Sequence, residues 1–211
     1  MQLSKRTFKI IISSSVALVV VSLFSVGFAT WSVMEGDQLN VEDGKIVVES
    51  VDASNVNKFE NVPTVSNAIC FGHPEDTSIY GFTDPWLNVN GNKVENLTCY
   101  IDAQITGLTI DNYDKILVVD DLVESSGKYA TAVSEGLVGA LPAAVISYVG
   151  DNTARVTFTF TWGTAFNNKN PYEFYNSQPQ SFALEVDASE KLSSLKTLLD
   201  GVNYSVKLST K

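Results

Sequence analysis

Apolar and polar residues alternate strictly from Arg155 to Trp162, and this alternation constrains the fold more than any other feature. Val156, Phe158 and Phe160 share the parity of the tryptophan, whereas the arginine and three threonines share the other. A period of two places successive side chains on opposite faces of an extended strand. The segment therefore predicts a strand with one face in a core and the other in water.

The same alternation recurs along the chain. It runs from Leu97 to Thr106, and Ala143 to Val149 reads as a partner strand for Arg155 to Trp162. Between these partners, Gly150 to Thr153 has the composition of a four-residue hairpin loop. Further strands are predicted at Lys45–Val51, Ile116–Val119, Ser181–Val186 and Val202–Leu208, and the Gly-, Pro- and Asn-rich region 55–96 predicts long loops with short strands.

One helix is clearly signalled near the end of the chain. Asp187 can cap its N-terminus with Glu190 three residues on, and Gly201 can end it. Its apolar stripe consists of Leu192, Leu195, Leu198 and Leu199. A second short helix is predicted within Asp120–Glu135. Many short strands with one or two helices predict a mainly β fold, an antiparallel β-sandwich of jelly-roll or immunoglobulin-like type, as a single domain over residues 30–211.

The N-terminal segment 1–29 has the layout of a signal peptide or of a membrane anchor. An uncharged run from Ile10 to Ala29 follows Lys5, Arg6 and Lys9. Small residues at positions −3 and −1 allow a cut after Ala29 or after Ser32. Twenty residues also suffice to span a bilayer as a helix, so a retained anchor is the alternative. In both cases the rest of the chain is exported, and we expect a secreted or cell-surface protein.

The charge balance narrows the range of partners. The chain carries a net charge of −10, and without its first 29 residues, three of them basic and none acidic, the net charge is −13. Such a surface repels nucleic acid phosphates and anionic lipids. We therefore expect no nucleic acid partner, and contact with a membrane only through residues 10–29 if they are retained.

Catalytic groups are sparse. His73 is the only histidine, so a serine triad or a two-histidine zinc site has little to build on. Cys70 lies near it, but nucleophilic catalysis needs a thiol and an imidazole oriented by a third group. A hydrolase using Asp120 and Glu124 would need a raised carboxyl pKa, which nothing around them signals. We expect a protein that is not an enzyme, with no catalytic residue and no resident cofactor.

Three further groups of residues each allow two interpretations. Cys70 and Cys99 can form one disulfide in an exported chain, or they are two separate buried thiols. Two acidic groups can hold Ca²⁺ or form a solvated surface; they are Glu35, Asp37, Glu42 and Asp43, and Asp120, Asp121 and Glu124. Aromatic residues in two loops can form a sugar-binding platform or plug the ends of a sandwich; the platform candidates are Trp86, Tyr172, Phe174 and Tyr175.

The junction Ala29-Thr30-Trp31-Ser32 is followed by Asp37 and by a first strand, Leu39 to Val48, that contains Gly44. This arrangement resembles exported proteins of Gram-positive bacteria that a W-type signal peptidase processes, the group of the biofilm-fibre protein TasA and camelysin. The resemblance implies a cut near Ser32, a jelly-roll-like sandwich, and a role in the extracellular matrix or surface structure of a bacterium of that type.

Together these patterns predict a secreted or surface-held structural or adhesive protein. It would contact copies of itself or related surface proteins through strand edges, with residues 31–48 as a candidate donor strand. The alternative is an extracellular carbohydrate-binding module that uses the aromatic platform and binds glycans.

Overall fold

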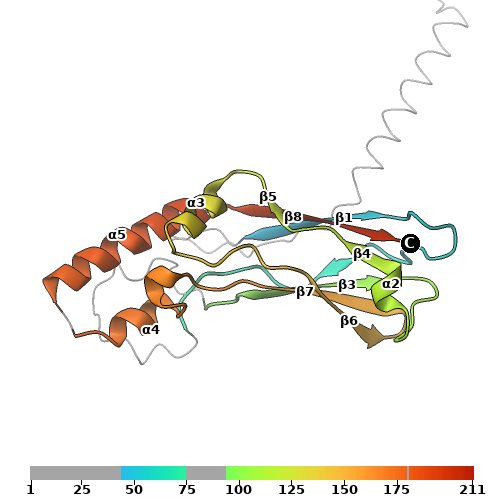
Figure 1. The fold of residues 1–211 in the computed structure, drawn as a ribbon, viewed down its shortest axis with the longest axis horizontal. Helices are drawn as coiled ribbons and strands as arrows, with labels where there is room; N and C mark the ends of the chain where they lie inside the picture. Colours follow the sequence, from blue (N-terminus) through green and yellow to red (C-terminus); the bar gives the residue numbers. More distant parts are fainter. Residues whose placement is uncertain (1–43, 75–93, 180) are drawn as a thin grey trace, which may run out of the picture.

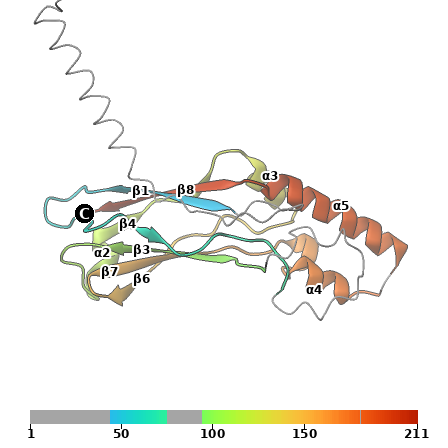
Figure 2. The same cartoon turned by 180° about the vertical axis from the view of Figure 1, so that it is seen from behind.

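The fold is described from a computed structural model that places residues 44–74, 94–179 and 181–211. Two four-stranded sheets form the body of the domain, and short helices gather mainly at one end of it (Figures 1 and 2). The leader 10–29, both cleavage candidates Ala29 and Ser32, and Trp86 lie outside the described residues. Among the helices that are described, none combines the length and hydropathy needed to cross a membrane.

The first sheet is organised around β8 (Asn203–Thr210), the last strand of the chain. β1 (Lys45–Val51) runs along one side of it in a parallel register, from Lys45 opposite Asn203 to Val51 opposite Ser209. β4 (Leu117–Val119) and β5 (Val123–Glu124) pair with β8 in antiparallel fashion. The prediction of uniformly antiparallel sheets is therefore wrong for β1 and β8, because alternation fixes which face is buried and not the direction of a partner.

The second sheet is antiparallel throughout, in the order β2 (Thr64–Val65), β3 (Thr98–Gln104), β7 (Thr153–Thr159) and β6 (Val145–Gly150). It confirms the predicted hairpin, but the loop is shorter than expected because Gly150 already pairs with Thr153. Asp151 and Asn152 alone make the turn, with φ of 46° and 57°. Type I′ hairpin turns require positive φ at both central positions, which Asp and Asn tolerate.

The helices are α2 (Tyr113–Ile116), α3 (Lys128–Ser134), the 3₁₀ turn η3 (Thr164–Phe166), α4 (Pro171–Asn176) and α5 (Phe182–Leu199). The strand predicted at Ser181–Val186 is wrong, because this segment is the first turn of α5. The Ser181 hydroxyl caps that helix by accepting a hydrogen bond from the Leu184 N–H at 3.2 Å. Phe182 at its start is 82% exposed, so the apolar alternation here has no core to face.

The core lies between the two sheets and follows the predicted parity. Buried residues alternate along β3, β7, the first half of β1 and β8: Cys99, Ile101 and Ala103; Ala154, Val156 and Phe158; Ile46 and Val48; Tyr204, Val206 and Leu208. The Phe160 and Tyr204 rings, 5.0 Å apart between centroids, join the sheets at the helical end. The described residues thus form a strand-rich, two-sheet domain that is compatible with a β-sandwich.

Candidate functional site

The aromatic residues predicted as a sugar platform lie in and beside α4. Asn170 begins this helix by accepting a hydrogen bond from the Tyr172 N–H at 3.0 Å, and Pro171 fits its first position. Tyr172 is 8% exposed and Tyr175 is fully buried. Phe174 is partly buried and packs edge-on against Tyr175, with 5.0 Å between ring centroids. Tyr172 and Tyr175 are thus packed into the fold, which leaves little of these two rings for a sugar to contact.

Tyr175 also joins α4 to α5. Its hydroxyl donates to Asp187 Oδ2 at 2.9 Å, and the Lys191 ammonium lies 3.0 Å from the same oxygen. Burial, and then the hydrogen bond to Asp187 and its negative charge, raise the pKa of the Tyr175 hydroxyl. Asp187, predicted as the helix cap, instead lies in the second turn of α5 and binds a neighbouring helix.

A polar cluster that the sequence did not reveal is centred on Glu95. Its Oε2 accepts hydrogen bonds from the Trp162 indole N–H and from the Asn170 amide, the latter at 2.6 Å. The Asn170 amide also donates to the Gly72 carbonyl at 2.9 Å. Glu95 and Asn170 together thereby tie the segments around Gly72, Glu95 and residues 162–170 to one another. The local sequence Val94-Glu95-Asn96 gives no signal of this cluster, because the partners of Glu95 are 67 and 75 positions away.

His73 lies beside this cluster and is 6% exposed. Its Nδ1 is 2.7 Å from the Pro74 carbonyl oxygen, and because a carbonyl only accepts, Nδ1 is the donor in this contact. Its ring meets the Tyr172 ring edge-on, with 6.4 Å between centroids. The imidazole is thus packed into the fold, with the Pro74 carbonyl and the Tyr172 ring as its described neighbours.

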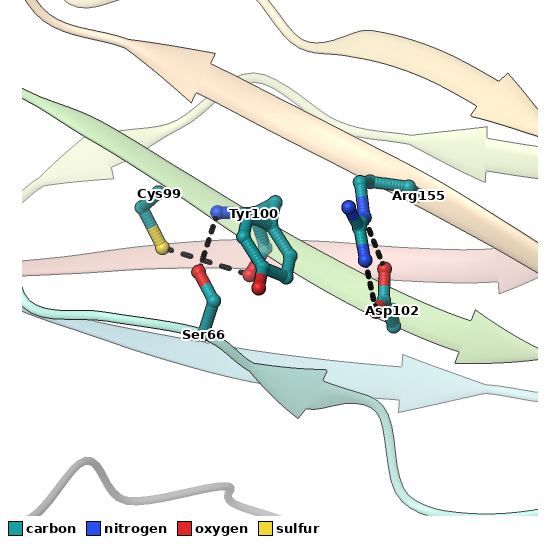
Figure 3. A network of polar contacts seen from close by, with 5 residues as sticks. All are labelled: Ser66, Cys99, Tyr100, Asp102 and Arg155. Carbon is teal, nitrogen blue, oxygen red and sulfur yellow. Dashed lines mark hydrogen bonds and ion pairs between the residues drawn. The ribbon is translucent and has the colours of Figure 1, made fainter. Parts of the chain in front are cut away.

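Cys70 and Cys99 are both buried thiols, and the predicted disulfide between them is absent. Cys70 pairs with Asn96 on the neighbouring segment. Cys99 lies three residues beyond Asn96 and pairs with Phe158. Three residues of a strand span about 10 Å, beyond the Cα separation of about 4.4–6.8 Å that a disulfide bridges. Burial raises the pKa of the Cys99 thiol, whose Sγ approaches the Tyr100 carbonyl at 3.8 Å (Figure 3).

The acidic group near residue 120 is used for structure. Glu124 accepts hydrogen bonds from the backbone N–H groups of Ser126 at 2.5 Å and Tyr129 at 3.3 Å, at the start of α3. Burial alone would raise its pKa, but the hydrogen bonds outweigh burial and lower the pKa of this carboxyl. A general acid needs the opposite shift, so the geometry does not favour the hydrolase interpretation.

Asp120 and Asp121 line a small surface pocket with Glu49 and Lys207. Within the described ranges, no group of three or more His, Cys, Asp or Glu side chains is arranged to hold a metal ion. The other calcium candidates, Glu35, Asp37, Glu42 and Asp43, lie outside those ranges. Lys207, which lines the same pocket, carries a positive charge that opposes a cation, so the pocket fits the solvated-surface interpretation of this group.

The outer face of the second sheet carries a rigid polar unit. The Arg155 guanidinium makes two hydrogen bonds to Asp102, at 2.7 and 2.8 Å, and lies 3.8 Å above the centre of the Tyr100 ring (Figure 3). Ser66 on the neighbouring segment accepts the Tyr100 N–H at 3.0 Å. One face of this tyrosine is therefore covered by the arginine, so the unit holds β3 and β7 together and does not offer an open ring to a ligand.

The β6 edge, defined as the side of Val145–Gly150 that faces away from β7, is the surface best suited to a partner. β6 is the last strand of its sheet, and on this side no backbone hydrogen bond joins it to the rest of the described chain. Val145 and Val149 are 65% and 47% exposed. Natural edge strands are often blocked by Lys, Pro, an inward charge or a β-bulge. β6 carries none of the first three, and its register shift lies near its end, between Tyr148 and Gly150.

The candidate donor strand 31–48 lies only partly within the described residues. Its last residues, Lys45 to Val48, belong to β1 and pair with β8 of the same chain. Its earlier residues lie outside the described part. Donating Lys45 to Val48 to a neighbour would break four of the seven residue pairs of this ladder.

No protein-family model, no curated protein and no solved structure matches this chain. The candidate surface therefore depends on the geometry of the molecule itself, and among the residues described that geometry points to the β6 edge.

Proposed function

We propose that the protein is an exported structural or adhesive protein, without catalytic activity, at the surface or in the matrix of a bacterium of the Gram-positive type. It contacts neighbours through strand edges, and its two sheets belong to a jelly-roll or immunoglobulin-like sandwich. The observation that carries this proposal is the β6 edge. This strand edge is uncharged and exposed, and on the side away from β7 its backbone groups make no hydrogen bond to the described residues. The export layout of residues 1–29 and the resemblance to the TasA and camelysin group support the location.

The use of the acidic groups is consistent with this role. Asp102, Glu124 and Asp187 each hold two structural elements together, and Glu95 holds its segment to residues 162–170. Carboxylates that make such contacts stiffen a domain, because breaking a contact leaves hydrogen-bonding groups without partners and lowers the stability of the fold. A stiff domain suits a protein whose work is to bind neighbours and carry load.

The pairing of β1 with β8 supports attachment at the N-terminal end. A force applied to the chain on the N-terminal side of Lys45 acts along β1. The evenly spaced hydrogen bonds of the parallel ladder between β1 and β8 share that force. The ladder covers the full length of β1, so it resists being opened one bond at a time. A surface-held domain benefits from this arrangement.

The test is the mass and association state of the mature protein recovered from the producing cell. We expect it in the medium or at the cell surface, beginning at Thr30 or Val33, or at Met1 if the anchor is retained. We also expect multimers whose fraction rises with concentration. A full-length chain recovered inside the cell, or a strict monomer at every concentration reached at the surface, would contradict the proposal.

A further inference from the structure

We infer that the β6 edge pairs with the β6 edge of a second copy of this chain, antiparallel and about a two-fold axis at Ser147. This inference rests on the proposed function and names the surface and the partner. Joined in this way, the two four-stranded sheets become one continuous sheet of two copies.

The register follows from the exposed side chains of β6. Val145, Ser147 and Val149 are exposed, whereas Ile146 and Tyr148 are partly buried. In an antiparallel pair centred on Ser147, Val145 of each copy lies opposite Val149 of the other. Each such pair brings β-branched side chains together across the strands, and this is a favoured cross-strand combination. Two valine pairs thus form around one serine pair on the face shared by both copies.

The charge pattern directs contact between two copies to β6. The chain has a net charge of −10, so two copies repel each other over most of their surfaces. Residues 136–150, between Glu135 and Asp151, carry no charge at all, and β6 is the exposed strand of this run. In the proposed register the two Asp151 side chains lie at opposite ends of the joined strands, so they do not oppose each other. β6 therefore offers an uncharged contact on an otherwise acidic molecule.

The strength of the contact follows from its size. A single pair of six-residue strands buries much less area than the roughly 1,200–2,000 Å² of a stable interface. Association in dilute solution is therefore weak. It rises where many copies are held close together, as at a cell surface. Val149 is the extra residue of a β-bulge against β7, and the bend there ends the paired length at Val149.

The first experiment places a cysteine on the two-fold axis. Ser147→Cys is made in the full mature protein, and covalent dimers are measured by non-reducing gel after mild oxidation. Residues directly opposite each other have Cα atoms about 4.5–5.5 Å apart, within disulfide range. We expect a covalent dimer from Ser147→Cys and none from the control Thr159→Cys. The control residue is exposed on β7, the neighbouring inner strand of the same sheet.

The second experiment tests the register and the contact itself. Val145→Cys and Val149→Cys should cross-link when the two variants are mixed, and much less when either is oxidised alone. Val145→Lys should reduce the Ser147→Cys dimer by roughly tenfold, because a lysine desolvated at a strand pair opposes pairing. Thr159→Lys should leave the dimer yield unchanged. Circular dichroism of each variant checks that the fold is retained.

The outcomes separate the inference from the proposed function. Multimers that form without a Ser147→Cys cross-link, or that survive Val145→Lys, overturn the β6 pairing and leave strand-edge assembly elsewhere. An exported protein that stays monomeric at every concentration overturns both.

Discussion

Asp102 and Arg155 lie directly opposite each other on β3 and β7, and their side chains form a two-bond ion pair at 2.7 and 2.8 Å. This pair fixes the register of the two central strands on their outer face, where no core residue can do so. The guanidinium also stacks on Tyr100, two residues before the aspartate on β3.

Replacing Arg155 with Lys should lower the free energy of unfolding by about 0.5–1 kcal/mol, since an ammonium keeps the charge but loses the two-bond geometry and the ring contact. The value is small because both side chains are about one-third exposed. Urea unfolding measures it, and a double-mutant cycle with Asp102→Asn isolates the pair. A coupling free energy indistinguishable from zero would show that the pair contributes geometry and no stability.

Replacing Glu95 with Ala should cost about 1–3 kcal/mol, because the buried Trp162 indole N–H and Asn170 amide lose their shared acceptor. Glu95→Gln keeps one acceptor oxygen and should cost less. Denaturant unfolding followed by tryptophan fluorescence is the measurement. Glu190→Ala, on an exposed position of α5, removes the same charge without such partners and is the control. Equal losses for the two alanine variants would contradict the role given to Glu95.

Glu124 should make the stability depend on pH in a defined direction. Its folded pKa is lowered, so its contribution is fully present above the ordinary value of 4.5 and is lost as the pH falls through the lower folded pKa. Glu124→Gln should therefore lower Tm at pH 7, by an amount corresponding to about 0.5–1 kcal/mol, and the difference should vanish in acid. Glu135→Gln, at the other end of α3, is the control and should not destabilise the helix. A difference that persists in acid would contradict the assignment.

The two cysteines should behave as separate, protected thiols. In the native protein, burial and the raised pKa of Cys99 should slow alkylation strongly. After unfolding without a reductant, both thiols should react, and the mass should rise by two labels. A denatured protein that takes up no label until it is reduced would show a disulfide and contradict the register described for Cys70 and Cys99.

The features that the sequence predicted well are local. Alternation located β3, β7, β6, β1 and β8 to within a few residues, because a half-buried strand shows its period within its own length. It failed at Ser181–Val186, where Phe182, Leu184 and Val186 alternate by chance on a capped helix. The capping serine and the helical stripe that follows are the local signals that could have corrected this.

The features that it missed are contacts between distant residues. Glu95 meets Asn170 across 75 positions, and Lys45 meets Asn203 at the far end of the chain. The composition of the loop around Tyr172 and Tyr175 did not reveal whether its rings are exposed or buried, because that depends on α5 and on Phe166. The β6 edge was likewise invisible, since a strand's place at the border of a sheet depends on where its partners lie.

The central position of β8 sets the order of events when this chain folds. β1, β4 and β5 all take their partner from the last strand, so half of the domain has no template until residues 203–210 are present. Such distant pairing slows folding. If the chain is exported as proposed above, this delay would keep it unfolded during transport, because β1, β4 and β5 pair only with β8.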